Sequence, residues 1–269
     1  MQTIVLIDAT YFVYWHYHAI LSKNSTVDPV RDPIFVSIFK QSFQKCVSEL
    51  CDNLGLRKDR TLLLAAKDGD CDLLWRRVLW PDYKVDTVSN KDKEQERKFR
   101  HEFLEMVFAS ELFKTSGVKH VLHHPRLEAD DCIALAALQA LRRSPDVQII
   151  VISNHTAFLQ LTGENRVVLR NLFFRDLGVD KDGERINADV FLFTKVAMGD
   201  PPKNIPPFKE RCSKAAAMRY FADPLELSAV FKENKDTKRQ FYLNQKLIDF
   251  HHIPKPLESE FLANPIFEP

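Results

Sequence analysis

The stretch that decides the fold runs from Lys119-His120-Val121-Leu122-His123, through Leu127-Glu128-Ala129-Asp130-Asp131, into Ile133-Ala134-Leu135-Ala136-Ala137-Leu138. The first run has the short, apolar and β-branched character of a strand, and the last has the composition of a helix. Between them, three carboxylates stand within four residues, and their charges repel one another. Water, a helix N-terminus or a divalent cation must offset that repulsion. The segment therefore predicts a strand, a turn rich in carboxylates, and a helix that begins at the carboxylates.

Similar apolar runs recur along the chain and alternate with helical patterns. This alternation is typical of a mostly parallel sheet with helices on both faces, so we expect an α/β fold. Sheets of this kind bind their ligands at the carboxyl ends of the strands. The expected strands are 3–7, 61–66, 119–123, 147–153 and 167–171, and the expected helices are 33–53, 97–115, 129–143 and 188–198.

Polar residues follow these strands at the points where they end. Asp8 follows the first strand, Asp68 follows the second, and the carboxylates at 128, 130 and 131 follow the third. The fourth strand runs into Ser153-Asn154-His155. Because the carboxyl ends of parallel strands meet at one edge of a sheet, we expect these side chains to converge.

The composition bounds the class of protein. The chain has 269 residues, 45% hydrophobic residues and 20 Phe, which is enough for a sizeable core, and its net charge of +1 indicates no general coating of nucleic acid. Its five cysteines form no C-x-x-C pair, which argues against a zinc site or a disulfide framework. With no signal-peptide pattern and no run of 18 apolar residues, we expect an intracellular protein of the cytoplasm or nucleus, neither secreted nor membrane-bound.

The composition of the sequence changes after Gly199-Asp200. Prolines cluster at 201–207, and five basic residues against one acidic residue lie between 201 and 221. Beyond this loop the chain reads as helical to about residue 250. We therefore expect a core at 1–200 and a helical C-terminal region at 201–269 that packs on the core.

In order along the chain, several motifs resemble those of the flap endonuclease and 5′-3′ exonuclease superfamily, which has a PIN-like fold. The phage ribonuclease H branch is the most similar. The E-A-x-D pattern is present as Glu128-Ala129-Asp130-Asp131, and Gly199-Asp200-Pro201-Pro202-Lys203-Asn204-Ile205-Pro206 resembles G-D-x-x-D-N-I-P. Ile7-Asp8 resembles the first-strand aspartate, and Asp68 resembles the second, with a basic segment behind it.

The resemblance implies phosphodiester hydrolysis with two Mg²⁺ or Mn²⁺ ions about 4 Å apart, on DNA or RNA–DNA hybrids and alongside replication or repair proteins. It implies that Asp8, Asp68, Glu128 and Asp130 hold the first metal and take part in catalysis, while Asp131 and Asp200 assist that metal or the second. It also implies that Lys84 steers the scissile phosphate. The other nucleic-acid-binding candidates are Lys98 and Arg100 in an arch region, and Lys209, Arg211 and Lys214 in a helix–three-turn–helix.

The chain departs from the family pattern at acidic positions. Where the family has S-x-D-x-D after its fourth strand, this chain has Ser153-Asn154-His155-Thr156-Ala157, so His155 and Ala157 replace the aspartates. Lys203 replaces the second aspartate of G-D-x-x-D. Losing anionic ligands and gaining a lysine weakens the attraction for dications, and we expect the second metal site to suffer most.

Several readings follow from these departures. The protein is either a 5′ nuclease whose hydrolysis is weakened, or a pseudo-nuclease that kept the fold and the nucleic-acid surface. A protein-interaction role as a subunit of a larger complex is a third possibility. The carboxylates at 128–131 could also serve only as partners of a helix dipole, and His155 is more readily a hydrogen-bonded side chain than a metal ligand.

Overall fold

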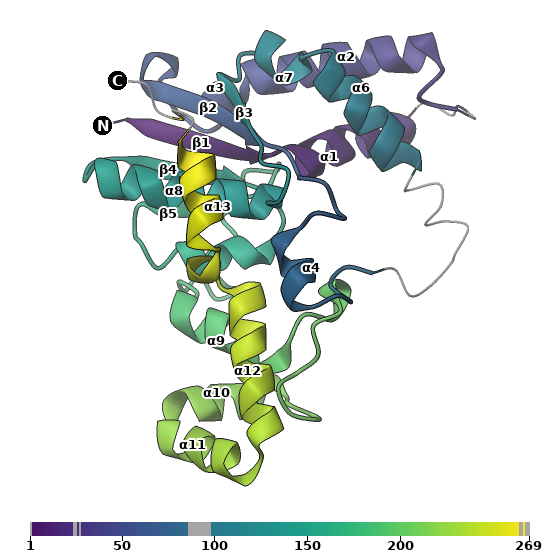
Figure 1. The fold of residues 1–269 in the computed structure, drawn as a ribbon. Coiled ribbons are helices and arrows are strands. Elements are labelled where there is room, and N and C mark those ends of the chain that lie inside the picture. The colour runs from purple at the N-terminus through teal and green to yellow at the C-terminus, as the bar shows by residue number, and fades with distance from the viewer. Residues whose placement is uncertain (1, 24–25, 27, 86–97, 264–265, 267–269) are drawn as a thin grey trace.

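The chain forms an α/β structure, seen here in a computed structural model that describes residues 2–23, 26, 28–85, 98–263 and 266. Its centre is a five-stranded parallel sheet with the strand order β3-β2-β1-β4-β5 (Figure 1). The order reverses between β1 and β4, which are neighbours in space but far apart in sequence, and such a switch point is where open α/β sheets form a ligand crevice. The strands are β1 (Thr3–Asp8), β2 (Thr61–Ala66), β3 (His120–Leu122), β4 (Gln148–Ile152) and β5 (Val167–Arg170).

Two apolar layers cover the two faces of the sheet. Successive side chains of β1 alternate between them: Val5 and Ile7 belong to one layer, and Ile4 and Leu6 belong to the other. The helices over the first face are α1 (Ala9–Leu21), α2 (Pro33–Ser48), α3 (Leu50–Asn53), α6 (Leu104–Ala109) and α7 (Leu112–Thr115), and those over the second are α8 (Ala129–Arg143) and α13 (Lys255–Leu262).

Local sequence explains where the helices that reach the site begin. The Asp8 side chain caps α1 by accepting a hydrogen bond from the N–H of Tyr11 at 3.1 Å. Glu128 and Asp131 form a reciprocal capping box at the start of α8. Asp8 therefore both ends β1 and caps α1, whereas Glu128 caps α8 from the loop that follows β3.

The C-terminal region has an apolar cluster of its own. Phe208, Tyr220 and Phe241 pack together at the far end of the molecule from α2 (Figure 1). The last helix then returns to the main core, where Leu257 and Phe261 pack with residues of α8. The helices of this region are α9 (Ala188–Met198), α10 (Lys214–Ala222), α11 (Pro224–Glu233) and α12 (Lys235–Ile248).

The remaining helical segments are short. A five-residue helix, α4 (Trp75–Leu79), lies between the sheet and α12. A π-helix, η2 (Phe99–Phe103), leads into α6. The 3-10 helices are η1 (Lys58–Arg60), η3 (Thr156–Leu161), η4 (Pro201–Lys203) and η5 (Phe250–His252).

The structure confirms the expected α/β fold with its parallel sheet. All five strands lie where the sequence predicts them, with ends that differ by at most one residue, and the helices expected at 129–143 and 188–198 are α8 and α9. The single helix expected at 33–53 is interrupted at Glu49 and forms α2 and α3. Within the described residues, no helix is long and apolar enough to cross a membrane.

Candidate functional site

Asp8 lies at the switch point of the sheet. It ends β1, and its carboxylate accepts a hydrogen bond from the Ser153 hydroxyl at 2.8 Å, just beyond the end of β4. In turn, Ser153 Oγ accepts a hydrogen bond from the N–H of His155 at 3.0 Å. The two strands at the reversal are therefore joined through a buried carboxylate, and His155 is held beside it.

Asp68 reaches the same edge of the sheet from the turn after β2. The turn lies against the chain before α8, because the N–H of Gly69 donates to Leu127 O at 2.8 Å. A Cβ at Gly69 would lie 2.6 Å from that carbonyl oxygen, so only glycine fits there. This approach lets Asp68 accept hydrogen bonds from the N–H of Ala129 at 2.9 Å and from the Thr10 hydroxyl at 3.1 Å.

Arg76 joins two of the carboxylates at the start of α8. The Arg76 guanidinium donates two hydrogen bonds of 2.7 Å to Asp131 and one of 2.7 Å to Glu128, and all three side chains are buried. The indole N–H of Trp75 also donates to Asp131, at 3.1 Å. Because protein donors enclose Asp131, its carboxylate acts as a structural ion-pair partner in this structure.

Glu128 has two further partners on the same segment as Arg76. The Tyr83 hydroxyl donates to Glu128 Oε2 at 2.8 Å, and the Lys84 ammonium forms an ion pair with Glu128 Oε1. Burial alone would raise the pKa of Glu128, but Arg76, Lys203 and Lys84 outweigh it and lower that pKa to about 2. Glu128 is therefore ionised and already balanced by cations of the protein.

Asp130 is bound by the residues that replace acidic positions of the family pattern. His155 Nδ1 lies 2.7 Å from Asp130 Oδ2, and Lys203 Nζ lies 3.4 Å from the same oxygen. Burial would raise the pKa of Asp130, yet His155, Lys203 and Lys84 hold it well below its usual range. The structure thus pairs a predicted metal ligand with a histidine and a lysine.

Asp8 shows the opposite electrostatic balance. Its burial, together with the nearby charges of Asp130 and Asp68, raises its pKa to about 6. Within the described residues, no lysine, arginine or histidine forms an ion pair with Asp8 or Asp68. Carboxylates from three strands and their loops therefore converge. Cations of the protein pair with the carboxylates at the start of α8, but not with Asp8 or Asp68.

Asp200 lies at the edge of this group. It pairs with Ile205 in a short bridge, and Lys195 Nζ lies 3.3 Å from its carboxylate. The bridge requires Gly199, whose φ is +73° and whose added Cβ would lie 2.4 Å from Ile205 O. A small pocket adjoins Asp200, and Lys203 and Arg76 are among the residues that line it.

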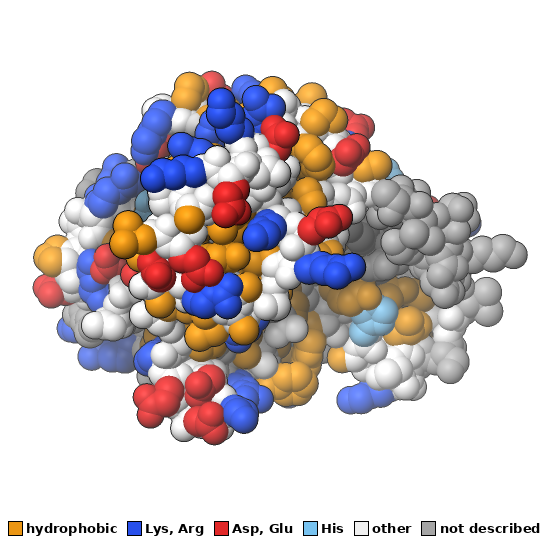
Figure 2. All heavy atoms as spheres, turned by 90° about the horizontal axis from the view of Figure 1, so that it is seen from below, with side chains coloured by type: hydrophobic (Ala, Val, Ile, Leu, Met, Phe, Trp, Pro, Cys, Tyr) orange, Lys and Arg blue, Asp and Glu red, His pale blue; other side chains and the backbone are white. Residues whose placement is uncertain are grey.

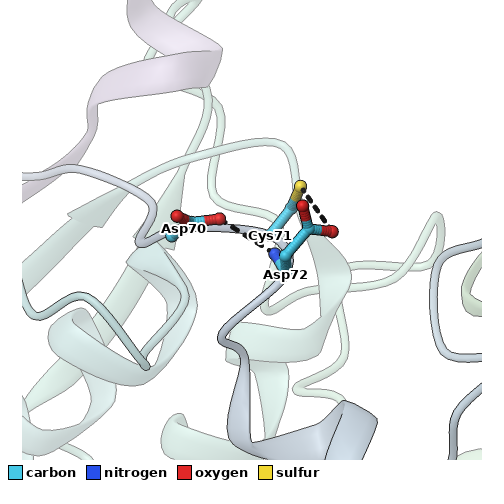
Figure 3. A group of neighbouring side chains, drawn as sticks. All are labelled: Asp70, Cys71 and Asp72. Atoms are coloured by element: carbon cyan, nitrogen blue, oxygen red, sulfur yellow. Dashed lines mark hydrogen bonds between the residues drawn. The ribbon is translucent and has the colours of Figure 1, made fainter.

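The carboxylates of this group do not form a compact cluster of ligand atoms among the described residues. Of all described residues, only Asp70, Cys71 and Asp72 bring three potential ligand atoms within 4.8 Å of one another, and all three are exposed (Figure 3). Figure 3 shows that this trio belongs to a turn in which Asp70 accepts a hydrogen bond from the N–H of Asp72 at 3.0 Å. Hydrogen bonding in a turn explains this arrangement without a ligand.

Apart from Lys84, which pairs with Glu128, the predicted nucleic-acid contacts lie outside this buried group. Lys98 is exposed, and the side chain of Arg100 and the charged run at 86–97 lie outside the described residues. Lys209 and Arg211 are exposed in the loop before α10, and Lys214 is the first residue of that helix. The face that carries α10 and α11 mixes basic, acidic and apolar side chains (Figure 2). Phosphate contacts there would depend on individual side chains.

Sequence reasoning missed the role of Arg76. It counted the residue with a basic segment, whereas the guanidinium is only 2% exposed and pairs with carboxylates 52 and 55 positions away. The flanking Trp75 and the later Tyr83, both aromatic and both buried, were the available signal that this segment enters the core. Thr10, which donates to Asp68, was also not singled out, and Ser153 was expected at this edge of the sheet without its hydrogen bond to Asp8.

Comparison with known proteins agrees with this architecture. The bacteriophage T5 D15 protein, solved with metal ions, superposes with a TM-score of 0.67 at 17% identity over 98% of each chain. A pseudo-enzyme–product complex of the T5 D15 flap endonuclease with DNA and metal ions gives a TM-score of 0.66 at 18% identity, over 98% of this chain and 97% of that one. No curated protein matched the sequence. The family model of the 5′-3′ exonuclease N-terminal resolvase-like domain matches residues 3–191, and this chain therefore belongs to that family.

Proposed function

We propose that this protein binds 5′-ended or branched DNA, or RNA–DNA duplex, and that its metal-dependent phosphodiester hydrolysis is weakened or lost. One observation carries the proposal: the Asp130 carboxylate is bound by both His155 and Lys203. A hard dication prefers free carboxylate oxygens and water. To coordinate Asp130, it would have to displace a histidine and enter beside an ammonium group.

The fold and the surface support nucleic-acid binding. The chain has the architecture of a 5′-3′ exonuclease domain, and basic residues 209, 211 and 214 lie on an exposed loop and the start of a helix. The T5 complex offers a parallel, because that aspartate-to-lysine variant is a pseudo-enzyme bound to DNA. By analogy, the lysine at 203 would be compatible with binding and unfavourable for turnover. The five cysteines are free thiols, which agrees with a reducing compartment.

A flap substrate tests this proposal. Cleavage of a labelled 5′-flap duplex is measured with Mg²⁺ and with Mn²⁺, and binding of the same duplex is measured in Ca²⁺. We expect salt-dependent binding with slow or undetectable cleavage. Rapid cleavage by the natural chain, abolished in Asp130→Asn, would show that the protein is an ordinary nuclease. If the protein binds none of the nucleic acids tested, only the protein-interaction role remains.

A restoration variant makes the test sharper. The substitutions His155→Asp, Ala157→Asp and Lys203→Asp together return the acidic residues of the family pattern. We expect the triple variant to gain cleavage with Mg²⁺ or Mn²⁺, because a dication would again meet free carboxylates. A triple variant that folds, binds DNA and still does not cleave would contradict the claim that these three positions caused the loss.

A second candidate is residual hydrolysis assisted by a single Mg²⁺ or Mn²⁺. The observation that favours it is the pair Asp8 and Asp68, which lack an ion-pair partner among the described side chains and reach the same edge of the sheet, Asp8 at the switch point itself. Under this alternative, slow cleavage by the natural chain depends on Asp8 and Asp68 and survives the variant Asp131→Asn if that variant folds.

A further inference from the structure

We infer that Lys84 and Lys203, with His155 beside them, do the electrostatic work that metal ions would otherwise do, so that a nucleic-acid phosphate is held at this site without any divalent cation. The inference rests on the proposed function, because it assumes that nucleic acid reaches the carboxylate group. It goes further by naming the groups that bind the phosphate and by predicting that this binding requires no metal.

The three side chains act on two carboxylates from three different segments. His155 and Lys203 share one oxygen of Asp130, whereas Lys84 binds the oxygen of Glu128 that Arg76 leaves free. The segments that carry the two lysines are joined directly, because the N–H of Lys84 donates to Lys203 O at 3.2 Å. The cations are therefore fixed by the fold around the carboxylates, which is the preorganisation that an anion site requires.

Exposure places the cations between the carboxylates and solvent. The side chains of Lys84 and His155 are 40% and 34% exposed, whereas those of Glu128 and Asp130 are 2% and 11% exposed. An incoming phosphate therefore meets an ammonium and an imidazole before it meets a carboxylate. The Lys203 side chain is only 15% exposed, so it offsets the charge of Asp130 from a more buried position.

The geometry predicts a specific relation between lysine and metal. Without cations, the carboxylates would repel a phosphate, and only a bound dication could reverse that repulsion. With Lys203 present, the repulsion from Asp130 is already offset, and a dication adds little. Replacing Lys203 by aspartate removes a positive charge and adds a negative one, so phosphate binding should then come to depend on metal.

Fluorescence anisotropy with a labelled 5′-phosphorylated flap duplex tests the inference at fixed ionic strength, since affinity for nucleic acid varies steeply with salt. Each protein is titrated in EDTA and in Ca²⁺. For the natural chain we expect dissociation constants in the two buffers that agree within about twofold. For Lys203→Asp we expect binding in EDTA to weaken by about tenfold or more, with most of the loss recovered in Ca²⁺.

Two further variants serve as controls. Lys203→Arg keeps the charge in a different shape and should lose less affinity in EDTA than Lys203→Asp. Lys181→Asp makes the same charge change on an exposed loop away from the site and should show no dependence on metal. Circular dichroism melts establish that each variant is folded before its affinity is compared.

The outcomes separate this inference from the proposed function. Natural protein that binds the duplex only in Ca²⁺, or Lys203→Asp that binds equally well in EDTA, overturns the inference and leaves nucleic-acid binding intact. Natural protein that binds no nucleic acid in either buffer overturns the proposed function itself.

Discussion

His155 Nδ1 lies 2.7 Å from Oδ2 of Asp130. Lys203 approaches the same oxygen, and the pKa of Asp130 lies far below its usual range as a result. Asp8, on the neighbouring strand end, has its pKa raised to about 6 by burial and by the charges of Asp130 and Asp68. Ionised Asp8 therefore destabilises the fold and ionised Asp130 stabilises it, and this difference can be measured.

Asp8→Asn should stabilise the protein at pH 8. The folded-state pKa of about 6 exceeds the unfolded value of 3.8, so the folded state binds more protons between these values and loses stability as the pH rises through them. The shift corresponds to at most about 3 kcal/mol, and asparagine keeps the helix cap, so we expect a gain of about 1–3 kcal/mol at pH 8 and almost none at pH 4. Urea denaturation at the two pH values measures it.

Asp130→Asn is the matched variant with the opposite expectation. Because the folded-state pKa is depressed, ionised Asp130 stabilises the fold above its unfolded pKa, and that stability is lost as the pH falls. The amide leaves His155 and Lys203 without their carboxylate, so we expect a loss of about 1–3 kcal/mol at pH 8. Stabilisation by both amides would mean that the cations do not balance Asp130.

Arg76→Met should destabilise the protein strongly. It leaves the buried carboxylates of Glu128 and Asp131 without their shared cation, and removing one partner of a buried ion pair typically costs about 3–5 kcal/mol. Chemical denaturation gives the change in the free energy of unfolding. A matched variant on the partly exposed neighbour, Arg77→Met, should cost less than about 1 kcal/mol, because its ion-pair partner Asp72 is exposed; equal losses would contradict the assignment of Arg76 to the core.

His16 should make the protein sensitive to mild acid. The side chain is buried, and its Nε2 atom has no hydrogen-bond partner. Burial lowers the pKa of His16, and the hydrogen bond to Phe12 O raises it by less. Since the unfolded state binds the proton more readily, stability is lost as the pH falls through 6.5. We expect the melting temperature of the natural chain to fall more between pH 7.5 and pH 5.5 than that of His16→Leu.

His251 provides the control for this pH effect. Its hydrogen bond to Asp249 raises its pKa, so its contribution is present below pH 6.5 and is lost as the pH rises. Relative to the natural chain, His251→Gln should therefore lose stability at pH 5.5, although only slightly because the side chain is largely exposed. The same shift for both variants would show that the acid sensitivity arises elsewhere.

The basic loop before α10 should set the salt dependence of binding. We expect Lys209→Gln, Arg211→Gln and Lys214→Gln to weaken binding of every duplex alike and each to reduce the slope of log affinity against log salt by about one. Anisotropy titrations at several salt concentrations measure the slope. Lys232→Gln on α11 is the matched control, and a slope unchanged in all four variants would remove this loop from the interface.

The sequence predicted the elements well because their signals are local. The strand at 61–66 is a run of apolar and β-branched residues, and α8 begins where carboxylates can cap it. The sequence also predicted that carboxylates following different strands converge, since a parallel sheet brings its carboxyl ends together. The domain boundary near residue 200 stays a prediction. Helix α9, which precedes residue 200, packs against α10 and α12, which follow it.

The pairing of charges could not be predicted. That His155 and Lys203 occupy acidic positions is visible in the sequence, but their contact with Asp130 depends on where two loops end in space. Likewise, nothing local distinguishes Arg76 from its neighbour Arg77, because only the fold decides which guanidinium meets the buried carboxylates.

Calorimetric titration with Mn²⁺ tests the central claim most directly, using the natural chain and the variant carrying His155→Asp, Ala157→Asp and Lys203→Asp. If cations of the protein already balance the carboxylates, the natural chain binds Mn²⁺ at least about tenfold more weakly than the variant. Two ions bound by the natural chain as tightly as by the variant would contradict it.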